Sequence, residues 1–239
     1  SLGSMYHTLR LIENRTRACL RDRMETLCLG GMCATDEDKP EGAVNIPAAK
    51  SGFVRFVGLA KLNDLARDAE VQITVTRSPG EYILRGQPVA WATGGDNELC
   101  KAASRAIDIG DVRSFDQDPS FGLSLLAETA QRALSPGVND PGTAVEVMGR
   151  LERLRWENTP AGDVSDTRKA THPHVSIPPV TASRLLDCAF PPIARCGSDS
   201  PSVMRWMEKS LEALSRHPNP DMAKAAAQMR QKLHDGHWT

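Results

Sequence analysis

Residues 113–144 read RSFDQDPSFGLSLLAETAQRALSPGVNDPGTA, and this stretch decides how the chain is organised. Two Asp-Pro pairs, Asp118-Pro119 and Asp140-Pro141, enclose an apolar segment. Each pair places a carboxylate just before a proline at the first helical position, where the missing proline N–H would be unpaired in any case. The stretch therefore predicts two consecutive helices, over residues 119–134 and 142–157.

The same pattern, a capping residue followed by proline, recurs further along the chain at Ser200-Pro201 and Asn219-Pro220. These pairs predict helices over 201–216 and 220–234, with another helix over 181–195 before them. At all four starts we expect the Asp, Ser or Asn side chain to cap the helix. Upstream, Asp96 is expected to cap a helix over 97–109, with Gly110 as its stop.

The helix predicted at 119–134 is apolar on most sides. Its polar stripe includes Glu128 and Arg132, which are four residues apart and are expected to form an ion pair. A helix of this kind is either the central element of a domain or an oligomer interface. We favour the central element.

Before the helical region, alternating apolar residues predict a small β module. Strands are expected over 51–57, 71–76, 82–84 and 88–92, with a helix over 61–69 and with 82–84 pairing back on 71–76. The glycine and proline spacing is similar to half of the repeat of biotinyl and lipoyl barrels, so a barrel-sandwich fold is expected. Lys50 lacks the flanking methionines of an acceptor lysine, so no covalent cofactor is expected.

Residues 174–180 are expected to form an edge strand, because proline cannot donate to a sheet. Loops are expected over 30–42 and 158–170. The predicted fold class is α+β. It comprises an N-terminal amphipathic helix (5–30), a small β-barrel or barrel-sandwich-like module (43–95) and a mainly helical domain (96–239).

Composition excludes several classes of function. The formal net charge of -1 gives no basic field for a nucleic-acid partner. No metal site is expected, because neither histidine pair reaches the three or four ligands that zinc needs. The six cysteines form no CxxC pair, which predicts reduced, mostly buried thiols of a cytosolic-type environment.

The helix expected over residues 6–29 is basic, with five arginines against two acidic residues between Met5 and Met24. Three interpretations remain open for this amphipathic helix: a solvated face, a partner-binding helix, or the juxtamembrane end of a membrane span.

Polar residues are concentrated at both ends of the helix at 119–134. The capping interpretation has Asp118 and Asp140 as N-caps, Asp116 paired with Arg113, and Ser135 in a helix stop. The alternative is a metal-dependent hydrolase or transferase using Asp116, Asp118, Asn139 or Asp140 around a divalent cation. Because a 16-residue helix is ~24 Å long, one joint site would need another packing or another subunit. The candidate functional residues are Arg113, Gln117, Asp118, Arg132, Ser135, Asn139, Asp140 and Thr143.

Three segments together carry a family resemblance: IPAAKSGFVRFV (46–57), RSPGEYILRGQPVA (77–90) and the stretch ending in RALSPGVNDPGTA. They resemble the soluble part of a bacterial family of predicted membrane proteins of unknown function, with about four N-terminal membrane helices. The resemblance implies an inner-membrane location with this domain facing the cytoplasm, and its own membrane-spanning segment as a partner. It supplies no catalytic residue.

From these observations we expect a non-enzymatic domain. Its expected role is in assembly, ligand sensing or gating of a transporter-like or channel-like anchor, and the domain is expected to form a homo-oligomer.

Overall fold

The computed structural model describes residues 2–35, 39–162 and 169–238. It divides into two compact units. The helical unit comprises residues 1–24, 119–167 and 181–239, and the β unit comprises residues 25–118 and 168–180. The expected loops at 30–42 and 158–170 fall partly on residues 36–38 and 163–168, which lie outside the described residues.

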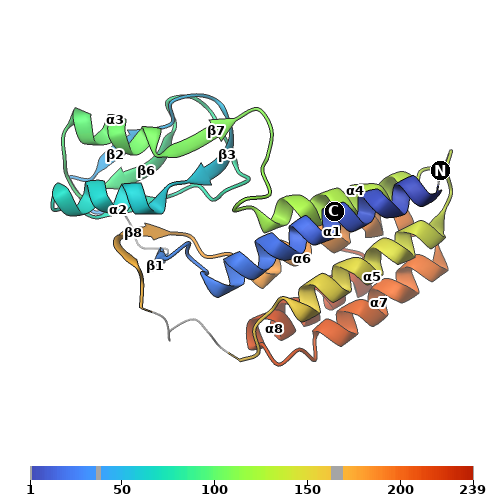
Figure 1. Ribbon diagram of the computed structural model, residues 1–239. Coiled ribbons are helices and arrows are strands. Elements are labelled where there is room, and N and C mark those ends of the chain that lie inside the picture. Colours follow the sequence, from blue (N-terminus) through green and yellow to red (C-terminus); the bar gives the residue numbers. More distant parts are fainter. Residues whose placement is uncertain (1, 36–38, 163–168, 239) are drawn as a thin grey trace. The chain divides into compact units, whose positions relative to one another are not determined.

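Helix α4, expected from its apolar sequence, is one of the packed helices of the helical unit (Figure 1). Helix α4 packs against both α5 and α6, and α7 and α8 pack on these two helices in turn. The buried side of α4 includes Leu123, Leu126 and Ala130, none of which is exposed to solvent. The helices of this unit are α1 (Leu2–Glu25), α4 (Pro119–Ala133), α5 (Pro141–Glu157), α6 (Ala182–Gly197), α7 (Pro201–Leu214) and α8 (Pro220–His234).

The four helices predicted from an Xaa-Pro pair all begin at the proline. In α5, Asp140 accepts the N–H of Thr143 at 3.1 Å, and in α8, Asn219 accepts that of Met222 at 3.1 Å. The predicted cap was wrong at Ser200, whose side chain makes no capping hydrogen bond. Its hydroxyl lies 3.2 Å from that of Ser202. Proline fixes φ at the first helical position, so this start does not depend on a side-chain cap.

The β unit contains two open sheets, so the prediction of a barrel was wrong (Figure 1). Its strands are only two to six residues long, and the two sheets share no hydrogen-bonded edge among the described residues. A barrel closes only when its first and last strands pair. Helices α2 (Leu59–Asp68) and α3 (Asn97–Arg105) belong to this unit, and its buried core draws on both sheets.

The five-stranded sheet has the order β1-β8-β4-β6-β2, and the three-stranded sheet has the order β5-β3-β7. The strands are β1 (Gly31–Cys33), β2 (Val44–Pro47), β3 (Gly52–Val57), β4 (Ile73–Val75), β5 (Tyr82–Ile83), β6 (Pro88–Ala92), β7 (Ile107–Gly110) and β8 (His172–Ile177).

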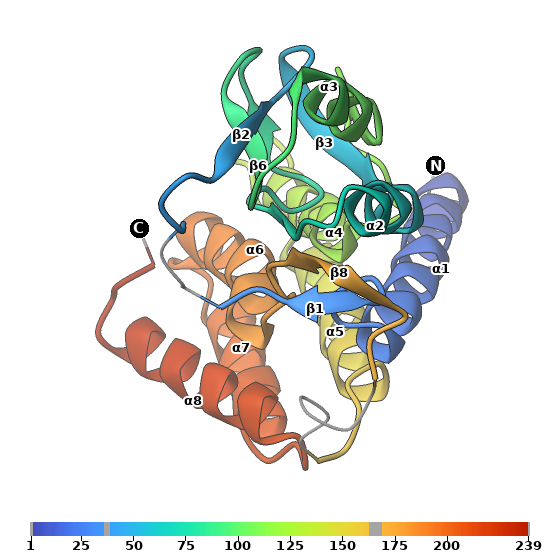
Figure 2. The ribbon, with the colours of Figure 1, turned by 90° about the vertical axis from the view of Figure 1, so that its left-hand side faces the viewer.

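Strand pairing differs from the predictions in three places. First, β8 is an interior strand that runs parallel to both β1 and β4, whereas an edge strand was expected. Figure 2 shows β8 beside β1. Pro173 is tolerated because it falls where the register shifts between Gly31 and Met32. Second, β1 forms where only a loop was expected.

Third, β5 pairs with β3 and not with β4. A related error affects the helix expected over 97–109. Asp96 does cap α3, accepting the N–H of Leu99 at 2.9 Å, but the helix ends at Arg105. Residues 107–110 form β7, because Ile107 and Ile109 alternate with outward residues and bury their side chains.

Cys28 and Cys33 form a disulfide with a Cα–Cα distance of 5.4 Å, so the prediction of six reduced thiols was wrong. The intervening turn has Leu29 at φ 53° and Gly30 at φ 84°, and the N–H of Gly31 donates to the carbonyl of Cys28 at 2.8 Å. This tight turn brings the two cysteines together. Cys19 and Cys100 are buried, as expected of small apolar side chains.

Candidate functional site

The first group of candidate residues lies in the segment between β7 and α4. Gln117 is 8% exposed and uses both ends of its amide on one residue of β3. Its Oε1 accepts the N–H of Val57 at 2.8 Å, and its Nε2 donates to the carbonyl of Val57 at 3.1 Å. Gln117 thus completes the backbone hydrogen bonding at the end of β3, which is a structural role.

Asp118 is also engaged within the β unit. Its Oδ2 accepts from Nε of Arg113 at 2.9 Å and pairs with Nη2 of the same arginine at 2.7 Å. The carboxylate is 2% exposed and lies so close to Gly80 that a Cβ there would overlap it. Gly80 has a φ of +96°, so both its backbone and its neighbour require glycine. Arg113 was expected to pair with Asp116, and the ion pair that the structure shows for it is with Asp118.

The second group forms the turn between α4 and α5. The hydroxyl of Ser135 donates to the carbonyl of Arg132 at 2.7 Å, and the N–H of Asn139 donates to the carbonyl of Ser135 at 2.8 Å. Asn139 has a φ of 47°, a left-handed conformation that asparagine tolerates better than most residues. These contacts close the helix stop that the sequence predicted at Ser135.

Asp140 is held by Thr143, whose hydroxyl donates to Oδ2 at 2.6 Å and whose N–H donates to Oδ1 at 3.1 Å. The hydrogen bond from the Thr143 side chain, followed by that from its backbone, holds the pKa of Asp140 below its ordinary value. A carboxylate stabilised in this way is a helix cap with little tendency to act as a base.

The two groups do not form one site. They stand at opposite ends of α4, a 15-residue helix and so about 22 Å long. Arg132 forms the predicted pair with Glu128 at 3.9 Å, and its side chain is 83% exposed. Among the described residues, no three His, Cys, Asp or Glu side chains come together as a metal site would require.

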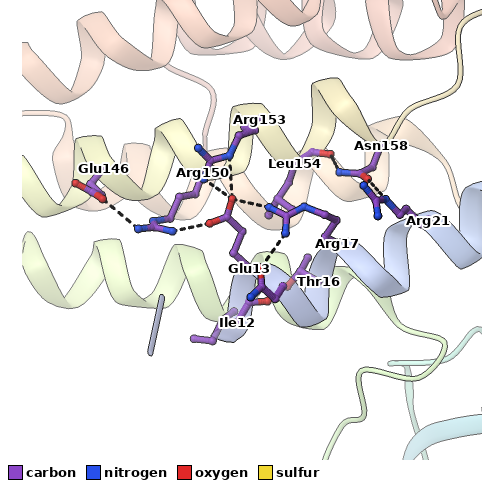
Figure 3. Close-up of polar contacts among 11 residues, drawn as sticks. Ile12, Glu13, Thr16, Arg17, Arg21, Glu146, Arg150, Arg153, Leu154 and Asn158 are labelled. Atoms are coloured by element: carbon purple, nitrogen blue, oxygen red, sulfur yellow. Dashed lines mark hydrogen bonds and ion pairs between the residues drawn. The ribbon is translucent and has the colours of Figure 1, made fainter. Parts of the chain in front are cut away.

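The role of one buried acidic residue of α1 was not predicted from the sequence. Glu13 on α1 has a side chain that is only 3% exposed, yet it binds three arginines (Figure 3). Oε2 pairs with Nη1 of Arg150 at 2.5 Å, while Oε1 accepts from Nε of Arg153 at 2.9 Å and pairs with Nη2 of Arg17 at 3.1 Å. Nη2 of Arg153 also contacts Oε1.

This cluster, which we call the Glu13 clamp (Glu13, Arg17, Arg150 and Arg153), ties α1 to α5. Burial by itself would raise the pKa of Glu13, but the hydrogen bonds from Arg153 and Arg150 outweigh it and lower the pKa. A signal was present in the sequence: Glu13 lies four residues after Leu9, on the side of α1 that is buried at Leu9, Thr16 and Leu20. A carboxylate on a buried helix face requires cationic partners.

The arginines of α1 therefore do not share one role. Arg10 is exposed, in line with a solvated face. Arg17 takes part in the Glu13 clamp, and Nε of Arg21 donates to Oδ1 of Asn158 at 3.3 Å just beyond α5 (Figure 3).

A buried arginine lies further along α5. Arg155 is 1% exposed, and its Nε and Nη1 have no hydrogen-bond partner among the described residues. Burial lowers its pKa to about 10, against the opposing influence of Cys188 and Asp221. The guanidinium therefore stays charged at neutral pH, at a cost to the stability of the helical unit.

A known protein family matches residues 1–213, and its description reads predicted membrane protein (DUF2254). The chain belongs to this family. An uncharacterized protein of Mycobacterium bovis and another of Mycobacterium tuberculosis are each 26% identical to it over 210 residues. Each alignment covers 83% of this chain but 40% of the relative, so the chain spans about two fifths of the relatives' length.

No solved structure matches the chain. Among the described residues, no helix combines the length and the apolar character that crossing a bilayer requires. The family resemblance seen in the sequence motifs is thus confirmed, and the family's description names no activity.

Proposed function

We propose that this chain is a non-enzymatic domain of a bacterial membrane protein, acting in assembly and gating. In this proposal, the domain self-associates and so holds the membrane-spanning parts of several copies together. Its own membrane-spanning segment, of a transporter-like or channel-like kind, is its working partner. Membership of a family of predicted membrane proteins and the greater length of the relatives support the proposal.

The observation that carries it is the Glu13 clamp. Separating a buried carboxylate from its arginines costs about 3–5 kcal/mol, because charges would be left unpaired. This cost opposes any turning or sliding of α1 that α5 does not follow. A displacement imposed on α1 would be passed to the helices that pack on α5, and these include α4 and α7.

The candidate residues support a non-enzymatic reading. Gln117 binds the backbone of β3, Asp118 forms an ion pair with Arg113, and Asp140 caps α5. An acid or base catalyst needs a group that can reach substrate with a proton or a lone pair to spare. The geometry gives no support to the metal-dependent hydrolase or transferase, because its four residues are split between the two ends of α4.

Two observations bear on which side of the membrane the domain occupies. The arginine excess of α1 favours the cytoplasmic side of the inner membrane, following the positive-inside rule. The Cys28–Cys33 disulfide is more typical of an oxidising compartment. Because Cys33 is exposed, cellular thiols have access to this bond, so in our proposal the arginine excess decides for the cytoplasmic side.

Two measurements test the proposal. Light scattering and sedimentation equilibrium of the 239-residue chain are expected to give a mass that rises with concentration above that of one chain. A single-chain mass at every concentration would overturn the assembly role. For the location, green fluorescent protein fused to the C-terminus of the full-length protein is expected to fluoresce, whereas activity of a fused alkaline phosphatase would place the domain outside.

A further inference from the structure

Strand β3 contains a bulge that sets which side chains leave the β unit. Val54 pairs with Ile109 and Phe56 pairs with Asp108, so that Arg55 is an extra residue without a partner in β7. An extra residue reverses the alternation of side chains beyond it. As a result, Val54 and Val57 both point inward, with exposures of 1% and 0%, and Phe53 and Phe56 both point outward.

The outer face of the three-stranded sheet is consequently apolar. Tyr82 of β5 pairs with Phe53, and their rings meet edge to face at 5.1 Å. Leu84, two residues after Tyr82 and just beyond β5, lies on the same side by alternation, and Val112 follows β7 in a bend. On this side or directly beyond its strands, the exposed apolar side chains are Phe56 at 45%, Tyr82 at 55%, Leu84 at 52% and Val112 at 64%. We call these four residues, with Phe53, the outer face.

The size of the outer face is that of a binding surface. A buried aromatic side chain removes 150–250 Å² from water, so Phe56 and Tyr82 each leave roughly 100 Å² exposed. With Leu84 and Val112, the apolar total is on the order of 300–400 Å², comparable to the largest patch on a typical monomer. A standard interface buries about 800 Å² per partner, so this patch would form the centre of one, surrounded by polar residues.

The charges on the outer face indicate what covers it. Arg55 and Asp108 stand next to each other with an N–O distance of 3.8 Å, and their side chains are 39% and 56% exposed. Arg55 lies across β7 at Gly110, where a Cβ would come within 2.6 Å of its Cδ. A surface with one cation and one anion side by side is complementary to its own image about a two-fold axis. Each Arg55 then meets the Asp108 of the other copy.

We infer that the outer face is a self-association surface, on which a second copy of this chain packs about a two-fold axis. The inference rests on the proposed assembly function and names the surface that would perform it. The apolar side chains form the centre of the contact, and two Arg55–Asp108 pairs between copies fix its register.

Sedimentation equilibrium on single substitutions tests this assignment. Phe56→Glu and Tyr82→Glu are each expected to raise the dissociation constant at least about tenfold, because a carboxylate replaces an aromatic ring at the centre of the contact. Trp206→Glu is the matched control: this aromatic residue on α7 is 39% exposed and lies outside the outer face, so association should not change. Circular dichroism and thermal unfolding check that each variant folds.

A charge-exchange experiment separates a contact between copies from a structural effect. Arg55→Asp and Asp108→Arg should each associate more weakly alone, since like charges then face each other across the axis. An equimolar mixture of the two variants should recover association, because each copy now presents the charges that the other lacks. No effect within a single chain gives this recovery.

The outcomes distinguish the two proposals. If the unsubstituted chain associates but the outer-face variants associate equally well, the surface assignment is overturned and the assembly function stands. If the unsubstituted chain stays a monomer at every concentration, both fail. If association weakens in the variants and the charge-exchanged mixture does not recover, the two-fold arrangement is wrong.

Discussion

Glu13→Gln is the substitution that tests the account of the Glu13 clamp most directly. Glutamine keeps the size of the side chain and one carbonyl oxygen, but it removes the negative charge that three arginines share. Arg150 has a side chain that is only 14% exposed, so water cannot replace the lost carboxylate there. Arg153, at 50% exposed, can turn to solvent.

The expected loss follows from this difference. Breaking a buried ion pair from one side costs about 3–5 kcal/mol, and the exposure of Arg153 places this case near the lower end, at about 3 kcal/mol. For a chain of this size, about 1 kcal/mol corresponds to a change in Tm of roughly 2–4 °C. The helical unit of the variant should therefore melt about 6–12 °C below that of the parent chain.

Differential scanning calorimetry and thermal unfolding followed by circular dichroism measure this change. Glu146→Gln is the control, because Glu146 also pairs with Arg150, at 3.2 Å, but is 37% exposed and should contribute less than about 1 kcal/mol. Adding Arg150→Met to Glu13→Gln should recover part of the loss by removing a largely buried cation that only the more exposed Glu146 would still pair with. A Glu13→Gln variant that melts within a degree of the parent would refute the reasoning.

The pH dependence of stability provides an independent check on the clamp. The pKa of Glu13 is lower in the folded chain than its ordinary value of 4.5, so folding favours the ionised form. Its contribution is complete above the unfolded pKa and is lost as the pH falls through the folded pKa. Asp140 acts in the same direction. Unfolding at a series of pH values should show stability falling below about pH 4.5, and less steeply in Glu13→Gln.

Four further substitutions test other parts of the structure. Gly122→Ala should destabilise the helical unit by about 1–2 kcal/mol in urea unfolding, because a Cβ would overlap the hydroxyl of the buried Thr16, which donates to the carbonyl of Ile12. Gly149→Ala, which has open space around it, should stabilise the helical unit by about 0.5–1 kcal/mol. Arg155→Met should raise the Tm of the helical unit, because it removes a buried charge whose Nε and Nη1 have no hydrogen-bond partner among the described residues. A lower Tm would count against that description. Cys33→Ser should cost the β unit about 2 kcal/mol, the value for closing so short a loop, and should abolish any effect of dithiothreitol on its unfolding.

Helix boundaries were the part of the fold most accessible from the sequence. A proline at the first helical position limits a start to one residue, and α4, α5, α7 and α8 all begin there. Strands β3, β4 and β6 were also found, since their alternation is local. Each of these signals depends on residues within a few positions of one another.

What the sequence did not reveal depends on partners far away in the chain. Nothing near His172 indicates that β8 joins a sheet between β1 and β4, because those strands lie about 100 residues or more upstream. The bulge at Arg55 likewise depends on the pairing of β3 with β7.

The candidate site residues show the same difference between local contacts, which the sequence indicates, and contacts with distant residues, which it does not. The cap at Asp140 is local and was predicted, whereas the contacts of Gln117 with Val57 span 60 positions and left its role unexplained. Glu13 was overlooked because its partners Arg150 and Arg153 are 137 and 140 residues away. A surplus of polar residues in a motif can thus be structural, with its reason lying elsewhere in the chain.

The position of β8 also determines the order in which the protein can fold during synthesis. One edge of β4 has its hydrogen-bonding groups unpaired until the ribosome has released residues 172–177, by which time α4 and α5 have already emerged. Strand β1 also lacks its partner until then, because it pairs with β8. An exposed strand edge is a template for wrong pairing. A nascent chain stopped before His172 therefore exposes the unpaired edges of β1 and β4. At this stage a chaperone that covers strand edges would limit wrong pairing.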